Sequence, residues 1–598
     1  MKRIIYFIIG LFLTFACQKI RIGNDFLDKP PGVDVTVDTI FSSIQYAERF
    51  LWGAYEMLPF GVDIGDLWNS KKRIFRLGHA QPDELTDLAH SFQGNFGINT
   101  LYYNGAYNAA LQADGFFNTI SLYSFWLDEG FQCIRKCYIF LENIDHVPNV
   151  DPAYVKRLKA EATLMIAIIY QDPWRYYGGM PWLTSASSMK DFIGEKKSFP
   201  RLTAQATCDS IVALCDKAAA DLPWVIPSNQ LAEWDGRLTK ASAMGLKARV
   251  LLFNASPLFN ADAPYLDGAA AQQKLVWHGG YDANRWKLAA DAAHDLITMC
   301  ESTGDYKLYH KAGNTYRQDF QDAYYRRGTG ETLISTRTDF KLNGSTTMNG
   351  YQQTWGLTSM TQECVDYFPM ANGKPITDPT SGYDPQNPYV NRDPRLYESV
   401  VVNGDQFQGR TAELWVGGRD RLAVTGTGIN SLMPRKFILD DDVNTSVGAI
   451  MQWPILRLPE IYLSYAEASN EFNNGPSAED YRCVNIVRNR VGLGNLPAGL
   501  TKEQFREAVF TERTREFVYE DVHLQDINRW KRDDIYKKHL HGLNIWRSSN
   551  PPYTYTYELV EIQPRYWVDH FSPKWYLQAF PLSEVKKGYG LIQNPGWE

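Results

Sequence analysis

Apolar residues recur at intervals of three and four along much of this chain, and this spacing most constrains its fold. In residues 151–169 the apolar positions fall on one face of a helix, because an α-helix turns once every 3.6 residues. The same spacing recurs in residues 208–222, 244–255, 286–297 and 461–472. Each apolar face needs a partner, so we expect pairs of amphipathic helices packed on one another. The spacing predicts a mainly α-helical protein.

Two segments carry signals for the start of a helix. Thr239 precedes one of the apolar stripes and is placed to cap it. Thr501 and Gln504 form a capping box, in which each side chain bonds a backbone N–H that the first helical turn leaves unpaired. We therefore expect helices to begin directly after Thr239 and Thr501.

Three long stretches lack such stripes, at residues 59–103, 302–440 and 541–575. They are rich in Gly, Asn, Asp, Thr, Tyr and Trp, and several of these residue types interrupt helices. Aromatic residues make up 14% of the chain, whereas disordered segments are poor in them. Because long loops in compact proteins are usually functional when ordered, we expect ordered loops that face a ligand.

The N-terminus has the three-part layout of a secretory signal. Lys2 and Arg3 precede an apolar run over residues 4–16, which ends directly before Cys17. The run is shorter than the about 20 apolar residues that span a bilayer. Export is therefore favoured over a permanent transmembrane helix.

The stretch Leu13–Cys17 resembles a bacterial lipobox. This resemblance implies a signal peptide over residues 1–16, lipidation of Cys17 and a tether over residues 17–35. Acyl chains on Cys17 would anchor the protein to a membrane without spanning it. Ordinary cleavage that leaves Cys17 as a free thiol is the alternative.

Charge and composition argue against several kinds of partner and cofactor. The net charge is −7 and no basic cluster stands out, so we expect no nucleic-acid partner. The scattered histidines and cysteines show no spacing typical of zinc sites. Asp440, Asp442 and Asn444 begin like a calcium loop, but Thr445 stands where the turn needs glycine. We expect no cofactor and keep a structural calcium ion as the alternative.

The sequence contains no nucleophile elbow, Walker loop or catalytic metal spacing. One charged segment could be interpreted as paired carboxylates with basic helpers, but its helical spacing is typical of a structural ion-pair ladder. We expect no enzymatic activity; a secreted helical glycoside hydrolase, which needs two carboxylates across a cleft, is the alternative. The charged residues are Glu512, Arg513, Arg515, Glu516, Glu520 and Asp526.

A series of distinctive segments runs the length of the chain. In order they are NDFLDKPP, IRKCYIFLENID, EATLMIAIIYQDPWRYYGGMPWL, RLTKASAMGLKARVLL, RLPEIYLSYAEASNE, VNIVRNRVGL and ERTREFVYEDVHLQDINRW. Together they resemble the SusD/RagB family of outer-membrane nutrient-binding lipoproteins. The last segment departs from the family pattern at Asp521, where glycine is common, and at His523, where arginine is common.

The resemblance implies a SusD-like fold, with four tetratricopeptide-type helix pairs supporting a large, loop-rich ligand-binding region. It implies one globular body over residues 36–598, with an N-terminal part of about 36–260 and a C-terminal part of about 280–598. It also implies a non-catalytic lipoprotein of the outer membrane that faces the exterior and captures oligosaccharides or polysaccharides. Its partner would be a SusC-type TonB-dependent barrel. A peptide-binding lipoprotein of the same fold is the alternative.

Sugar binding needs flat aromatic faces ringed by polar side chains, and the predicted loops offer both. Trp68 and Trp355 rank first because each sits among small polar residues, outside any helical stripe. For every candidate, packing against its own loop is the competing interpretation. The predicted ligand-binding residues are Asp66, Trp68, Asn69, Phe96, Tyr102, Tyr103, Tyr324, Tyr325, Trp355 and Arg435.

Overall fold

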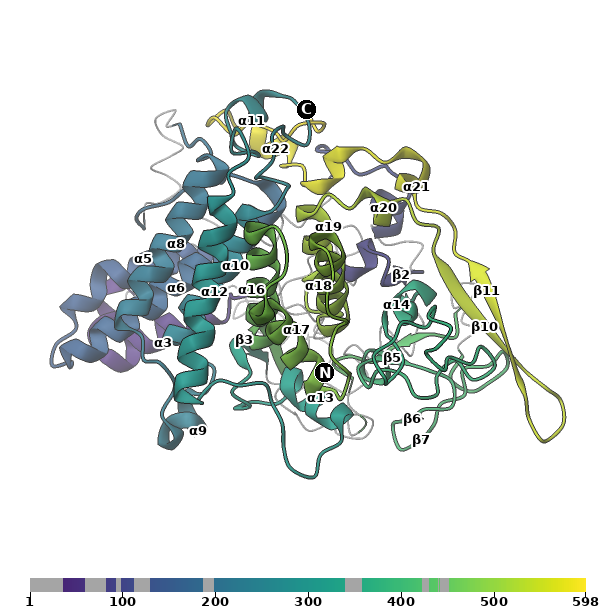
Figure 1. Ribbon diagram of the computed structural model, residues 1–598. Coiled ribbons are helices and arrows are strands. Elements are labelled where there is room, and N and C mark those ends of the chain that lie inside the picture. The colour runs from purple at the N-terminus through teal and green to yellow at the C-terminus, as the bar shows by residue number, and fades with distance from the viewer. Residues whose placement is uncertain are drawn as a thin grey trace, which may run out of the picture.

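A row of long helices makes up one side of the molecule, and an irregular region with short strands makes up the other (Figure 1). The structure is a computed structural model. It describes residues 36–59, 82–92, 98–111, 130–186, 198–338, 358–421, 430–438, 440 and 451–598.

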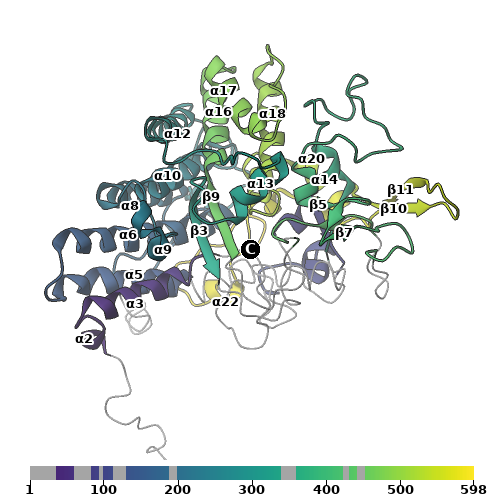
Figure 2. The same cartoon turned by 90° about the horizontal axis from the view of Figure 1, so that it is seen from below.

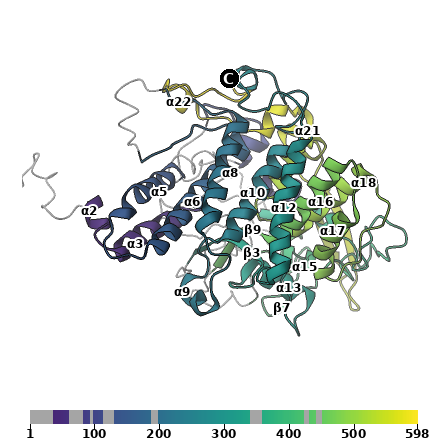
Figure 3. The same cartoon turned by 60° about the vertical axis from the view of Figure 1, so that its left-hand side comes forward.

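The long helices pack in chain order, each against the next (Figure 3). Four successive pairs make the row: α3 with α5, α6 with α8, α10 with α12, and α16 with α17. This arrangement confirms the predicted mainly α fold built from helix pairs. The helices are α3 (Ile44–Tyr55), α5 (Phe131–Asn143), α6 (Pro152–Tyr177), α8 (Ala204–Asp221), α10 (Lys240–Ala255), α12 (Asn284–Thr303), α16 (Leu458–Asn473), α17 (Ala478–Arg490) and α18 (Lys502–Glu516).

The apolar stripes form the core between these helices, as their spacing predicts. In α6, Leu158, Met165 and Ile169 are fully buried. The predicted caps are confirmed as well. Thr239 Oγ1 accepts a hydrogen bond from the backbone N–H of Ser242 at 3.3 Å. At the start of α18, Gln504 Oε1 accepts one from the N–H of Thr501 at 3.0 Å.

Short helices and antiparallel two-stranded sheets build the irregular region around a second apolar core. The strand pairs are β2 (Ala89–Ser91) with β4 (Thr358–Met360), β3 (Thr332–Thr338) with β9 (Met451–Arg457), β5 (Val400–Val401) with β8 (Met433–Pro434), and β6 (Gln406–Phe407) with β7 (Arg410–Thr411). The shorter α-helices of the whole described structure, on both sides of the molecule, are α2 (Val37–Ile40), α9 (Leu231–Trp234), α11 (Ala269–Gln272), α13 (Tyr316–Tyr325), α14 (Gln362–Tyr367), α15 (Leu396–Ser399), α19 (His523–Arg529), α20 (Asp533–Tyr536), α21 (Tyr566–His570) and α22 (Leu582–Val585).

The prediction of loop structure for residues 541–575 is wrong. Strands β10 (His541–Arg547) and β11 (Tyr555–Glu561) form an antiparallel hairpin that projects from the body (Figures 1 and 2). Leu543 and Ile545 are buried, whereas Trp546 beside them is 48% exposed. This alternation is the period of two expected for a half-buried strand. It covers only a few residues and lies among turn-forming residue types, so it gives a weak signal in the sequence.

Among the helices that the structure describes, none is both long enough and apolar enough to cross a bilayer.

Candidate functional site

The described segments before and after residue 68 contact the described segments before and after residue 355. Pro59 is the last described residue before Trp68, and its carbonyl accepts a hydrogen bond from Thr336 Oγ1 at 2.9 Å. Thr336 lies near the end of β3, the last described segment before Trp355. The two predicted loops are therefore anchored together where each begins.

The same two loops are also anchored together where each ends. Strand β2, which follows the Trp68 loop, pairs with β4, which follows the Trp355 loop, and Ser91 lies opposite Thr358. Glu84 reinforces this pairing, because its Oε1 accepts a hydrogen bond from Thr358 Oγ1 at 2.9 Å. Both anchors join distant parts of the sequence: Thr336 and Pro59 are 277 positions apart, and Thr358 and Glu84 are 274 positions apart.

Tyr102 and Tyr103, two predicted ligand contacts, are buried in the protein. The Tyr102 hydroxyl donates a hydrogen bond to Gln578 Oε1 at 3.0 Å. The Tyr103 hydroxyl donates one to the carbonyl of Glu84 at 2.5 Å, and the Arg565 guanidinium lies 4.4 Å from its ring centre. Both side chains are therefore packed inside the protein, which corrects the idea that they form an exposed platform.

Tyr324, Tyr325 and Arg435 are buried as well. Lys436 Nζ lies 5.0 Å from the centre of the Tyr324 ring. Arg435 donates hydrogen bonds to Asp440 Oδ1 at 3.0 Å and to the carbonyl of Gln406 at 2.9 Å. The structure thus gives these side chains partners inside the protein, and it does not bring them together as an exposed ligand surface.

The other site predictions lie outside the described residues and stay predictions. They are Asp66, Trp68, Asn69, Phe96 and Trp355 for ligand binding and Cys17 for lipidation.

Exposed aromatic residues that the sequence analysis missed lie on the β10–β11 hairpin and beside it. Trp546 and Tyr553 are each 48% exposed. The Arg547 guanidinium lies between two rings, 3.6 Å from the centre of Trp415 and 4.4 Å from that of Tyr553. The period-two alternation of residues 541–547 is the signal that could have placed Trp546 on an exposed face.

A buried network of arginines and carboxylates fills the region where α16, α17 and α18 meet the irregular region. Arg457 Nη1 lies 2.7 Å from a Glu331 oxygen and 2.9 Å from a Glu516 oxygen. Its Nε donates a hydrogen bond to Glu520 Oε2 at 2.8 Å. The predicted structural role of Glu516 and Glu520 is confirmed. One pair of the predicted ladder forms along α18, where Arg515 Nη1 lies 3.1 Å from Glu512 Oε2. The cationic partners of Glu516 and Glu520, in contrast, come from other segments of the chain.

The carboxylates of this network are unsuited to acid–base catalysis. Burial alone would raise the pKa of Glu512, but the guanidiniums of Arg395 and Arg488 outweigh it and lower the pKa to about 2. Asp526 follows the same pattern beside Arg513, with a pKa of about 2. A glycosidase acid needs a raised pKa and access to substrate. These groups stay ionised at neutral pH and are enclosed by protein.

Asp83 is a carboxyl group with the opposite shift. Burial raises its pKa to about 6, although His523 and the backbone N–H of Tyr519 oppose this rise. A raised pKa is typical of a catalytic acid. Asp83 is only 1% exposed, however, so substrate cannot reach it.

We expect Asp83→Asn to stabilise the protein at pH 7 and to lose this advantage as the pH falls to 4. The folded pKa of about 6 lies above the ordinary value of 3.8, so ionised Asp83 costs the folded state up to about 3 kcal/mol at pH 7. Below pH 4 the carboxyl is protonated in both states and the cost is gone. Urea unfolding at pH 4, 5, 6 and 7 measures the difference. Asp221→Asn, at an exposed position, is the control, and its free energy of unfolding should change with pH as that of the wild type does. If the stability difference between Asp83→Asn and the wild type is the same at every pH, the raised pKa assigned to Asp83 is wrong.

Asp521 and His523, the two departures from the family pattern, both have defined partners. Asp521 has φ 58°, in the left-handed region that glycine adopts most easily and that Asp tolerates. Its carboxylate accepts hydrogen bonds from Tyr176 Oη at 2.8 Å and Arg175 Nη2 at 3.2 Å. His523 Nε2 lies 2.9 Å from Asp87 Oδ1. Both residues therefore have polar partners from distant parts of the chain.

A groove of about 360 Å³ lies between the α8–α10 connection and strands β3 and β9. Ligand pockets usually measure about 300–1,000 Å³. Ser335 and Arg337 line it and flank Thr336, the residue that anchors Pro59. Arg337 is ion-paired with Asp235 at 2.9 Å, so the groove offers donors and acceptors without a dominant charge. Its other polar residues include Arg237, Thr239, Asp305 and Gln452.

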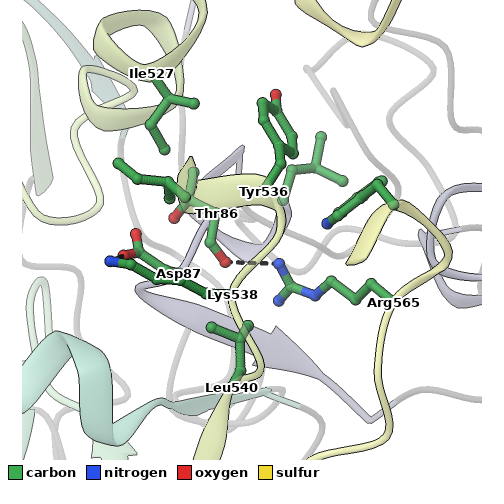
Figure 4. Close-up of a pocket in the computed structure, with 10 residues that line it drawn as sticks. Thr86, Asp87, Ile527, Tyr536, Lys538, Leu540 and Arg565 are labelled. Carbon is green, nitrogen blue, oxygen red and sulfur yellow. Dashed lines mark hydrogen bonds and ion pairs between the residues drawn. The ribbon is translucent and has the colours of Figure 1, made fainter. Parts of the chain in front are cut away.

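A second cavity, shown in Figure 4, holds only about 10 Å³. At the wall of this cavity, Lys538 Nζ lies 2.8 Å from Asp87 Oδ2. The Arg565 guanidinium donates a hydrogen bond to the carbonyl of Thr86 at 2.6 Å. Such a volume accommodates one water molecule and no substrate.

No group of three His, Cys, Asp or Glu side chains able to hold a metal occurs within the described part of the chain. Asp440, the first residue of the calcium-like run, accepts hydrogen bonds from Arg435 and from the backbone N–H of Gln408. Asp442 and Asn444 lie outside the described residues, so the calcium alternative stays a prediction.

The row of helices and the irregular region beside it define a class of protein. It is a scaffold of paired helices next to a region of loops and short strands, and contacts between distant parts of the chain hold that region together.

Comparison with known proteins identifies the family. Residues 301–597 match the model of the SusD family, and the chain belongs to this family. It is 21% identical over 550 residues to SusD-like protein P25 of Formosa agariphila, covering 88% of this chain and 90% of that protein. A SusD-like protein of Bacteroides fragilis has the same fold, with a TM-score of 0.71 and 21% identity, over 95% of this chain and 100% of the other. A SusD-like carbohydrate binding protein of the same organism gives a TM-score of 0.68 at 20% identity, over 92% and 99%.

Proposed function

We propose that this protein captures oligosaccharides at the cell surface without cleaving them and passes them to a SusC-type TonB-dependent transporter. Membership of the SusD family supports the proposal, as does the similarity to a B. fragilis protein described as carbohydrate binding. One observation carries it further. The described segments that flank residue 68 contact those that flank residue 355, and these contacts support a ligand site that uses residues of both predicted loops.

Aromatic and short polar residue types together, as the sequence offers in these two segments, suit a glycan. A pyranose ring presents apolar C–H faces and polar edges, which match an indole face surrounded by Asp and Asn side chains. The enclosed, ionised carboxylates of the charge network favour binding over hydrolysis. A peptide ligand is the second candidate, because peptide-binding surfaces also use Trp and Tyr.

Calorimetry with starch, xylan, galactan, mannan and β-glucan tests the proposed function. We expect one of these glycans to bind, and a reducing-end assay on the same mixtures to stay at background. New reducing ends would establish a hydrolase and contradict the proposal. If no glycan binds, native mass spectrometry of protein isolated from its host should be used to look for a bound peptide, which would establish the second candidate.

Lipidation of Cys17 is part of the proposal and has its own test. We expect mass spectrometry of the mature protein to show an N-terminal cysteine carrying acyl chains. Cys17→Ser should leave the protein unprocessed and without acyl chains, because the lipid is attached through the cysteine sulfur. An unmodified Cys17 in the mature wild-type protein would contradict a lipid anchor.

A further inference from the structure

We infer that the exposed face of the β10–β11 hairpin is a second glycan contact, with Trp546 as its platform and Asn544, Thr556 and Glu558 as its polar rim. This inference rests on the proposed function and extends it. The second contact binds the part of a long neutral glycan that reaches beyond the Trp68 and Trp355 loops.

The register of the hairpin places these four residues on one face. Asn544 lies opposite Glu558, and Trp546 lies opposite Thr556. Because side chains alternate between the two faces of a strand, residues two positions apart point to the same side. The short Thr556 side chain opposite Trp546 leaves the indole uncovered, and the indole is 48% exposed.

Hydrogen bonds within the hairpin hold this face in place. The indole N–H of Trp546 donates to Glu558 Oε2 at 2.8 Å, and Asn544 Nδ2 donates to the same oxygen at 3.3 Å. The ring therefore has a defined orientation before a ligand arrives. The two bonds, led by that from Trp546, lower the pKa of Glu558, so this side chain is an acceptor for sugar hydroxyls at neutral pH.

Side chains on the opposite face and the backbone of β10 tie the hairpin to the body. Arg547 stacks on Trp415, which belongs to a neighbouring segment of the irregular region. The backbone N–H of Val416 donates a hydrogen bond to the carbonyl of Ile545 at 2.7 Å. A hairpin held on one face by these contacts presents a rigid platform on the other, so binding costs little conformational entropy.

The base of the hairpin adjoins the anchor of the two loops. Asn430 accepts a hydrogen bond from the N–H of Leu543 at 3.0 Å and donates one to the carbonyl of Met360 at 2.5 Å. Met360 belongs to β4, the strand that follows the Trp355 loop. From Leu543 at this base, Trp546 lies three residues further along β10, roughly 10 Å away. A ligand that reaches from the two loops past this base to Trp546 must therefore be a chain of sugars.

The composition of the face favours a neutral glycan over other occupants. It offers one aromatic ring, a carboxylate, an amide and a hydroxyl, which together match the C–H face and hydroxyls of a sugar ring. The carboxylate of Glu558 repels phosphate and other anions. An isolated exposed tryptophan is common on protein surfaces; here the ring is oriented by a carboxylate and an amide on the same face.

The test compares short and long forms of whichever panel glycan binds the wild-type chain. We expect Trp546→Ala to weaken binding of the eight-sugar oligomer at least tenfold and to leave the two-sugar oligomer unchanged. Trp546→Phe, which keeps an aromatic face, should recover most of the lost affinity. Trp52→Ala, at a 45% exposed position on α3, is the matched control and should change neither. Circular dichroism melting checks that each variant is folded.

The outcomes separate the hairpin site from the proposed function. If the wild-type chain binds a glycan and Trp546→Ala binds both lengths normally, the hairpin site is wrong and the proposed function stands. Equal weakening of both lengths would also overturn the hairpin site, because a remote contact cannot affect the short ligand. If the wild-type chain binds no glycan in the panel, or binds peptide alone, both proposals fail together.

Discussion

Arg457→Met should lower the free energy of unfolding by about 3–5 kcal/mol, the usual cost of removing one partner from a buried ion pair. Arg457 is 1% exposed and contacts Glu331, Glu516 and Glu520. Methionine fills a similar volume without charge. The three carboxylates would then be buried with less positive charge to stabilise them, although Arg490 still contacts Glu331 and Glu516.

Chemical denaturation followed by circular dichroism measures this effect. The matched control is Arg482→Met, which removes an arginine that pairs with Glu301 and Glu479 at the surface. Exposed ion pairs contribute only about 0–1 kcal/mol, so this variant should remain close to the wild type. Equal losses in both variants would show that burial does not set the energy of this network.

Trp68→Ala and Trp355→Ala should each weaken binding of the cognate glycan about tenfold or more. Aromatic side chains at the centre of a binding site commonly contribute 2 kcal/mol or more, and 1.4 kcal/mol is a factor of ten in affinity. The shared anchors of the two loops predict that one ligand contacts both rings. The short and the long oligomer should therefore lose affinity alike, in contrast to Trp546→Ala.

Calorimetry with the glycan that binds the wild type measures these losses, and Trp52→Ala again serves as the control. Helix content should be unchanged in each variant, because neither tryptophan belongs to a predicted helical stripe. Unchanged affinity in both variants would discard this ligand site. It would leave the family assignment intact, since that assignment rests on residues 301–597 and the fold.

The helices were predictable because their signals are local. The apolar face of α6 and the capping box at Thr501 both depend on residues within a few positions of one another. Helical periodicity and capping follow from backbone geometry, so they can be recognised in a single sequence. The β10–β11 hairpin follows an equally local rule, but its alternation is short and stands among turn-forming residues, so its signal is weak.

The burial of the candidate aromatics was not predictable. Tyr102 and Tyr324 stand among polar residues, like a surface platform, yet both are enclosed. Tyr102 is enclosed partly by Gln578, which lies 476 residues away in the chain. No pattern around residue 102 reports what a segment so distant will cover.

Paired helices and the segments of the SusD family can be recognised from the sequence alone, because periodicity and motifs are properties of neighbouring residues. The packing of the whole fold sets which cations neutralise Glu516, which aromatic rings are enclosed, and that the described segments flanking residue 68 contact those flanking residue 355. Those outcomes depend on contacts between segments often more than a hundred residues apart. Such contacts form only when the helices and strands pack together, since burial and charge pairing are set by the whole fold.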